Sequence, residues 1–114
     1  MPANRDGVVL KAEAARTLAF GSISGTYADV GSVTANPVRI IMVKNLTDVA
    51  VTVSADDGTT DWFDLPANGA DTIDVFSNGG PDGAYLPVGS QFQVKDQGSG
   101  AASGKVVIQC YYVE

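Results

Sequence analysis

Alternation of apolar and polar positions runs through most of this chain and predicts β-strands. Apolar side chains recur at about every second position in residues 16–23, 49–53 and 91–95, which is the period of a strand with one buried face. Residues 38–44 and 105–113 are nearly continuous apolar runs, which are typical of central strands. Clusters of Gly, Asn, Asp and Pro between these segments predict turns. We therefore expect about eight antiparallel strands.

The spacing of these strands predicts an all-β fold built as one domain. Strand and turn signals recur roughly every 8–12 residues, a pattern typical of a β-sandwich or a small barrel. The 114 residues suit a single domain. We predict a single β-sandwich over residues 16–114, with jelly-roll or immunoglobulin-like topology, because spacing alone does not separate the two.

The turn at residues 45–48 joins two of the clearest strands. Asn45 and Asp48 are residue types that bond to their own backbone and favour chain reversal. We therefore expect residues 38–44 and 49–53 to pair as an antiparallel hairpin.

Residues 1–15 are predicted to form an N-terminal arm. A short helix over residues 8–19 and an extended strand through residues 8–10 both fit this composition, and the segment also fits the first strand of the fold itself. An arm that becomes ordered on binding can wrap around a partner. We take its candidate contact residues to be Arg5, Val8, Val9 and Leu10.

Charge is distributed unevenly along the chain, whose net charge is −6. Residues 1–45 contain five basic and three acidic residues, a net charge of +2, whereas residues 46–114 contain two basic and ten acidic residues, a net charge of −8. Eight aspartates and no Lys or Arg lie between Asp48 and Asp82. Such a surface repels phosphate, so we expect no nucleic-acid partner, whereas it suits solubility or a basic partner.

Most catalytic chemistry lacks its usual residues here. The chain has no His, which is the commonest general base and metal ligand, and its one Cys, Cys110, lies at strand spacing between apolar residues. We expect Cys110 to be buried and inert. We predict that the protein is not an enzyme and that it needs no cofactor and no metal.

Carboxylates leave two alternatives to that prediction. Asp61 with Asp64, or Asp71 with Asp74, has the composition of a glycosidase pair, but aspartates beside turns are common for backbone reasons. Asp56, Asp57 and Asp61 have oxygen ligands of the kind that calcium binds, without the spacing of the twelve-residue calcium loop.

Trp62 is the one tryptophan of the chain and is followed directly by Phe63. Neighbouring residues on a strand point to opposite faces, so one member of this pair is directed to the surface. Trp62 is therefore either an anchor of the core or an exposed contact residue. We include it among the candidate partner-contact residues.

No targeting or membrane segment is expected. The first six residues are polar and lack the apolar stretch of a signal peptide. No apolar run approaches the ~18 residues of a membrane span. We expect no membrane association.

Several consecutive segments of the chain resemble small virion structural proteins of tailed bacteriophages. The similarity covers roughly residues 16–113, and it consists of strand and turn patterns without a catalytic signature. The segments that carry it are residues 39–48, 51–54, 62–67, 74–78, 86–95 and the closing apolar run.

This resemblance implies a β-sandwich or jelly-roll subunit that is built into the virion and assembled in the host cytoplasm. The role it favours is that of a capsid decoration, or cement, protein, which clamps neighbouring major capsid proteins from outside the shell. Such proteins form homo-oligomers, typically dimers or trimers. A neck or tail adaptor, a fibre-attachment protein and a carbohydrate- or partner-binding module are the alternatives.

Overall fold

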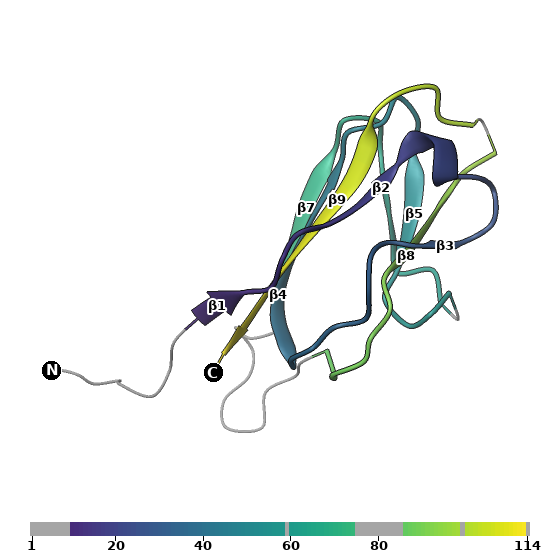
Figure 1. Cartoon of the computed structure of the whole chain (residues 1–114). Helices are drawn as coiled ribbons and strands as arrows, with labels where there is room; N and C mark the ends of the chain where they lie inside the picture. Colours follow the sequence, from purple (N-terminus) through teal and green to yellow (C-terminus); the bar gives the residue numbers. More distant parts are fainter. Residues whose placement is uncertain (1–9, 59, 75–85, 99, 114) are drawn as a thin grey trace, which may run out of the picture.

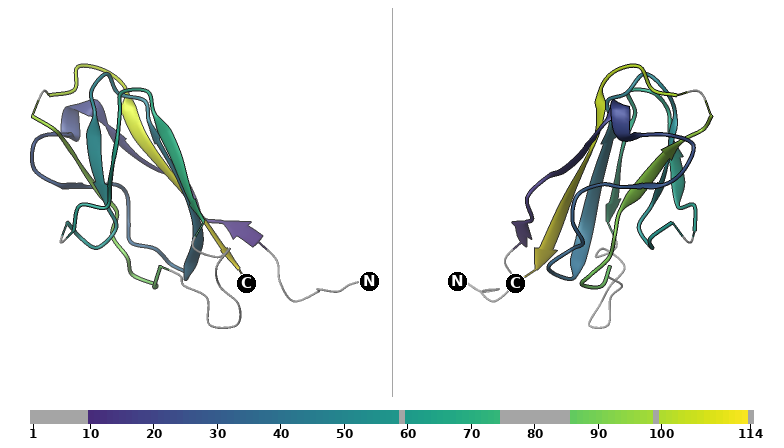
Figure 2. Two further views of the ribbon diagram at one scale, coloured as in Figure 1. Left: turned by 180° about the vertical axis from the view of Figure 1, so that it is seen from behind. Right: turned by 45° about the vertical axis from the view of Figure 1, so that its right-hand side comes forward.

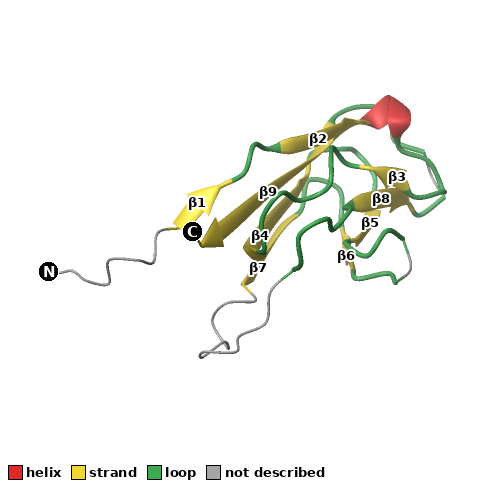
Figure 3. Cartoon of the chain, turned by 60° about the horizontal axis from the view of Figure 1, so that its bottom comes forward, coloured by secondary structure: helices red, strands yellow, loops and turns green. Residues whose placement is uncertain are grey.

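The computed structural model describes residues 10–58, 60–74, 86–98 and 100–113, and it confirms an all-β sandwich of two antiparallel sheets (Figures 1 and 2). Sheet A contains β1 (Leu10–Ala12), β2 (Arg16–Ala19), β4 (Val38–Asn45), β7 (Ala70–Asp74) and β9 (Lys105–Val113). Sheet B contains β3 (Ala28–Asp29), β5 (Val51–Ser54), β6 (Phe63–Leu65) and β8 (Gln93–Asp96). The two sheets form two layers (Figure 3). No helix among the described residues has the length and apolar composition of a membrane span.

The order of the strands identifies the topology. Sheet A runs β2–β9–β4–β7, with β1 also beside β9, and sheet B runs β3–β8–β5–β6. From β2 to β9, every pair of successive described strands except β5 and β6 is divided between the two sheets. An immunoglobulin-like sandwich instead keeps its first two strands in one sheet. The described strands therefore follow the jelly-roll order and not the immunoglobulin-like order.

The predicted hairpin between residues 38–44 and 49–53 is wrong. Strand β4 pairs with β7 and β9 in sheet A, whereas β5 pairs with β6 and β8 in sheet B. The connecting turn carries the chain across the sandwich around the fully buried Asn45, whose amide donates to the carbonyl oxygens of Val49 and Pro66 at 2.8 and 2.9 Å. Asn satisfies backbone groups in either kind of turn, so its presence does not distinguish a reversal within one sheet from a crossing between sheets.

The N-terminal end of the described chain forms strands and not the helix considered above. Strands β1 and β2 both pair with β9, in the registers Leu10↔Val113 to Ala12↔Tyr111 and Arg16↔Ile108 to Ala19↔Lys105. The alternation predicted through residue 23 ends earlier, because residues 20–22 form a short 3₁₀ helix, η1 (Phe20–Ser22). The boundary between an arm and the sandwich at residue 15 stays a prediction.

The core lies between the two sheets and consists of the inward-facing residues of both. Burial alternates along β9, where Val106, Ile108 and Cys110 are inaccessible to solvent. Burial raises the pKa of the Cys110 thiol to about 11, although the charge of Arg16 acts in the opposite direction. Cys110 is thus buried, as predicted, and its raised pKa keeps the thiol protonated. The buried apolar residues are Ile23, Val30, Val38, Ile41, Val43, Val51, Val53, Ala55, Leu65, Leu86, Phe92, Val94, Val106, Ile108 and Cys110.

Gly104 provides a direct test of the packing at one end of the sandwich. Its φ of +90° favours glycine, and a Cβ atom built on it would lie 2.0 Å from the carbonyl oxygen of Leu46. We expect Gly104→Ala to lower the free energy of unfolding by about 3 kcal/mol, through backbone strain and the displacement of the 46–47 backbone. Gly98→Ala is the matched control, because Gly98 has a φ of +102° but no atom within 4 Å of its Cβ position. Urea unfolding of both variants measures the difference, and equal losses would contradict the proposed close contact.

Candidate functional site

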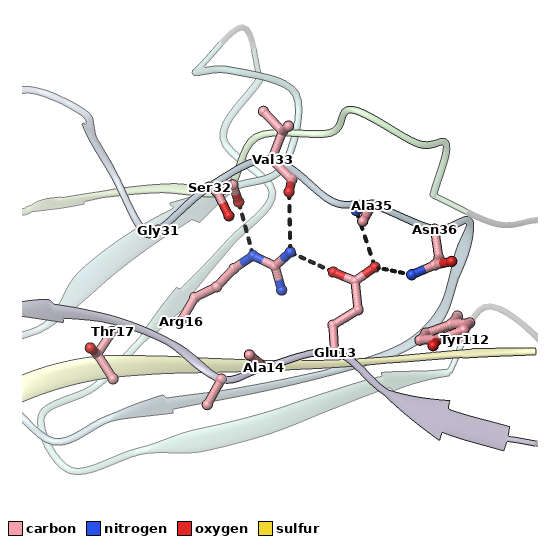
Figure 4. A pocket seen from close by; sticks show the side chains of 11 residues that line it. Glu13, Ala14, Arg16, Thr17, Gly31, Ser32, Val33, Ala35, Asn36 and Tyr112 are labelled. Carbon is pink, nitrogen blue, oxygen red and sulfur yellow. Dashed lines mark hydrogen bonds and ion pairs between the residues drawn. The ribbon is translucent and has the colours of Figure 1, made fainter.

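A buried ion pair joins the N-terminal edge of sheet A to the loop of residues 31–36 (Figure 4). Nη2 of Arg16 donates to Oε1 of Glu13 at 2.5 Å, and both side chains are 7% exposed. The guanidinium also donates from Nε to the carbonyl oxygen of Ser32 at 2.9 Å. Oε2 of Glu13 accepts from the backbone N–H of Ala35 at 3.1 Å and from the amide of Asn36 at 3.0 Å. We call this set of residues the Glu13–Arg16 clamp.

Two features allow Arg16 to be buried. Its Cζ lies 6.0 Å from the centroid of the Phe92 ring, a distance at which an aromatic face attracts a cation. Gly31 has a φ of +69°, and a Cβ on it would approach the Arg16 side chain to 2.7 Å, so only glycine leaves room for the guanidinium stem. Among the described residues, no group accepts a hydrogen bond from Nη1 of Arg16.

The pKa of Glu13 reflects this environment. Burial acts to raise the pKa, but the hydrogen bonds from Arg16 and Asn36 and the positive charge of Arg16 together hold it below its usual value of 4.5. Glu13 is therefore ionised at neutral pH. Sequence reasoning missed the clamp, since an isolated Glu and Arg three residues apart are common on solvated surfaces.

A hollow of about 550 Å³ lies beside the clamp, and Val33, which lines it, also lines a second hollow of similar volume. We call the second hollow the Trp62 groove. Trp62 is 36% exposed and Val33 is 47% exposed, and both line it together with Ala55, Pro87 and Gln91. Asp56 and Asp57 line the same groove. An exposed aromatic residue in a hollow is a typical contact residue of a protein interface.

The position of Trp62 decides between its two predicted roles. Trp62 precedes β6, where its backbone N–H donates to the carbonyl oxygen of Val53 at 2.9 Å. The neighbouring Phe63 packs against the core. The interpretation of Trp62 as a core anchor is therefore wrong, and the alternative, that its side chain is exposed, is the one that the structure shows.

The aspartates near Trp62 are mostly held by groups of the chain itself. Asp56 accepts from the Ser54 hydroxyl at 2.7 Å and from the Thr60 N–H at 2.9 Å, and these bonds lower the pKa of Asp56 to about 2. Asp61 accepts from the Tyr27 hydroxyl, and Asp64 accepts from the Thr52 hydroxyl at 2.8 Å. Within the described part of the chain, no three acidic or thiol groups lie close enough to hold a metal ion. Three of the aspartates proposed as catalytic or calcium-binding groups, Asp56, Asp61 and Asp64, therefore accept hydrogen bonds from other groups of the fold.

The fold has counterparts among solved structures. A chain of the capsid of Helicobacter pylori bacteriophage KHP30 is 10% identical, with 93% of this chain and 94% of that chain aligned and a TM-score of 0.56. A chain of the cyanophage Pam1 capsid is 12% identical, with 99% and 90% aligned and a TM-score of 0.54. A chain of Bacillus endospore appendages, described as disulfide-linked pili, is 8% identical, with 98% and 95% aligned and a TM-score of 0.54.

The shared feature is the fold. At such low identity, the likeness says nothing about which residues make contacts. No protein-family model matches the chain, and no curated protein matches it.

Two of the five predicted contact residues, Leu10 and Trp62, lie among the described residues. Arg5, Val8 and Val9 lie outside the described residues. Leu10 begins β1 in sheet A, whereas Trp62 lies beside β6 in sheet B. These two residues therefore belong to different sheets, and the role of each in binding stays a prediction.

Acid titration tests the clamp. The folded-state pKa of Glu13 is lowered, so its contribution to stability is present above the pKa of the unfolded chain and is lost as the pH falls through the folded value. We expect Glu13→Gln to cost about 1–3 kcal/mol at pH 7, because the amide loses a charge-assisted bond to Arg16. The variant should also lose less stability than the wild type as the pH falls below about 4.5, the usual pKa of a glutamate.

Asp56→Asn is the matched control for this experiment. The pKa of Asp56 is also lowered, to about 2, but its carboxylate bonds to Ser54 and Thr60 and not to an arginine. It should alter the acid titration without changing the docking of residues 31–36. Urea unfolding at several pH values measures both effects, and a Glu13→Gln curve parallel to that of the wild type would contradict the assigned role of Glu13.

Proposed function

We propose that this chain is a virion structural protein of the capsid decoration, or cement, type. It would bind the outside of a phage shell and clamp neighbouring major capsid proteins. The observation that carries the proposal is the likeness to chains of two phage capsids, which extends over at least 90% of each chain compared. The likeness to a spore pilus chain also supports a role in assembly, since that chain too belongs to a repetitive structure.

The side chains support a contact protein better than an enzyme. The chain has no His, its one Cys is buried, and the aspartates around Trp62 bond to neighbouring groups of the fold. The Trp62 groove instead combines an exposed aromatic with apolar walls and two carboxylates, as a contact with a basic segment requires. Many copies, each adding an interface of modest area, would stabilise the seams of a shell.

Quantification of the protein in purified virions tests the location. A decoration protein occupies repeated two- or threefold positions, so its copy number should be a large fraction of that of the major capsid protein. A ring of few copies at one vertex would instead support the alternative of a neck or tail adaptor or a fibre-attachment protein. Absence from the virion would overturn the proposal as a whole.

The carbohydrate-binding alternative is supported by one observation, which is the exposure of Trp62 beside carboxylate and amide groups of the groove. A glycan array probed with the wild-type protein and with a folded Trp62→Ala variant separates this alternative from protein binding. Binding that the variant loses would favour carbohydrate recognition.

Substitution of Trp62 tests the groove. We expect Trp62→Ala to weaken attachment to shells by at least about tenfold, because a central aromatic typically contributes 2 kcal/mol or more to an interface. Phe20→Ala is the matched control, since Phe20 is an aromatic of similar exposure, 39%, and does not line the groove. Co-sedimentation with shells measures both, and equal effects of the two variants would argue against a specific contact at Trp62.

Truncation tests the predicted arm. We expect deletion of residues 1–9, which include Arg5, Val8 and Val9, to weaken attachment without lowering stability. Deletion of residues 1–15 also removes β1 and Glu13, so it should lower the free energy of unfolding by leaving Arg16 without its carboxylate. Full occupancy of shells by the chain that lacks residues 1–9 would contradict the role of the arm.

A further inference from the structure

The outer face of sheet A differs from the outer face of sheet B. Residues directly opposite one another on paired strands share a face, so the register defines each surface. On sheet A, Ile40 faces Tyr111, and Met42 faces Gln109 on one side and Thr72 on the other. These positions alternate with the buried residues of β4 and β9, so their side chains point away from the core.

This outer face is apolar at its centre. Ile40, Met42, Val107 and Tyr111 are all partly exposed on the two central strands, β4 and β9. Met42, Val107 and Tyr111 line a depression of about 160 Å³, together with the polar side chains of Lys44 and Gln109. Small or uncharged residues occupy the flanking register positions, including Ala12, Thr17, Ala70 and Thr72. The charged positions on this face are Lys44, which lies opposite Val107, Asp74, which lies opposite Ile40, and Lys105 at the start of β9.

The outer face of sheet B is polar and bonded within itself. Thr52 donates to Asp64 at 2.8 Å, and the amide of Gln93 donates to Asp29 at 2.5 Å. The ammonium of Lys95 lies 3.6 Å from the carboxylate of Asp61. A face whose polar groups are satisfied in this way is suited to water, whereas the face of sheet A has the aromatic and Met content and the low charge of an interface centre.

We propose that the outer face of sheet A packs against the same face of a second copy of this chain, forming a two-fold dimer. Charge selects this face, because two molecules of net charge −6 repel one another least where carboxylates are fewest. Asp29, Asp61 and Asp64 lie on the opposite sheet. A second copy supplies an equally flat and apolar surface, and a two-fold axis makes the contact self-complementary.

The area of the face sets the expected strength of this dimer. The five strands of sheet A contain 29 residues, and at about 3.3 Å along a strand and 4.8 Å between strands they cover about 460 Å² per copy. A total of about 900 Å² lies just below the ~1,000 Å² of a stable specific interface, so the dimer should be weak and depend on concentration. Sheets that pack face to face in this way lie about 10 Å apart, as the two sheets of a sandwich do.

Sedimentation equilibrium of the full chain, from about 1 µM to about 1 mM, tests the proposal without any particle. We expect the wild-type mass to rise from that of one 11.7 kDa chain towards that of two. Met42→Asp should weaken the dimer at least about tenfold, because the two-fold axis places the new charge in the interface twice. Thr72→Glu is a second variant, at an exposed position of the same face, whose folding does not depend on packing at Met42.

Val88→Asp is the matched control, since Val88 is an apolar residue that is 59% exposed and lies outside sheet A. It should leave the dimer unchanged, and urea unfolding confirms that each variant is folded. A monomer at every concentration overturns the proposal, as does a dimer that resists both face variants or is weakened equally by Val88→Asp. If the wild type is monomeric and Met42→Asp reduces attachment to shells, the face binds another virion protein and not a second copy.

Discussion

The pairing of β9, the last strand of the described chain, with β1 and β2 from its N-terminal end and with β4 is the constraint on which the rest of sheet A depends. Strand β9 bonds to β4 on one side and to β1 and β2 on the other, so this edge of the sheet forms only when distant segments meet. The register Arg16↔Ile108 then places the guanidinium opposite Ser32 and Val33. Because Val33 also lines the Trp62 groove, the shape of that groove depends indirectly on the pairing of β9.

The chemistry of the Glu13–Arg16 clamp explains why charged residues occupy a buried position. The 31–36 loop has irregular backbone, and the clamp gives partners to the carbonyl oxygens of Ser32 and Val33 and to the N–H of Ala35. Apolar residues in place of the ion pair would fill the volume but could not form these bonds to the loop. A buried ion pair is weak evidence for net stability, so the role that follows from the geometry is to hold the loop in one conformation.

The sequence predicted individual strands better than their arrangement. Period-two alternation and the apolar runs are local signals, and β9 matches the predicted closing strand residue for residue. The sheet in which the strand after a turn will pair is not encoded in the turn itself. The prediction of a turn at Asn45 was therefore correct, whereas the prediction of a hairpin was wrong. Alternation along a strand is a local signal, and it correctly indicated that Trp62 and Phe63 point to opposite faces. The clamp could not be predicted because it depends on a contact between Glu13 and Arg16 and residues 31–36, which are distant in sequence.

The two proposed surfaces have no residue in common, and this separation affects how the protein would bind a shell. The Trp62 groove is lined by residues from the ends of sheet B strands and from loops, whereas the dimer face lies on the outer side of sheet A. Dimerisation would therefore leave both grooves free and display them about a two-fold axis. When one of two linked grooves is bound to a repetitive lattice, the second groove binds at a raised effective concentration, provided that the spacing of the grooves matches that of the lattice. Two linked grooves therefore bind such a lattice more tightly than one groove does. A weak dimer and a modest groove would then be sufficient for firm attachment to a shell, without a large interface at either surface.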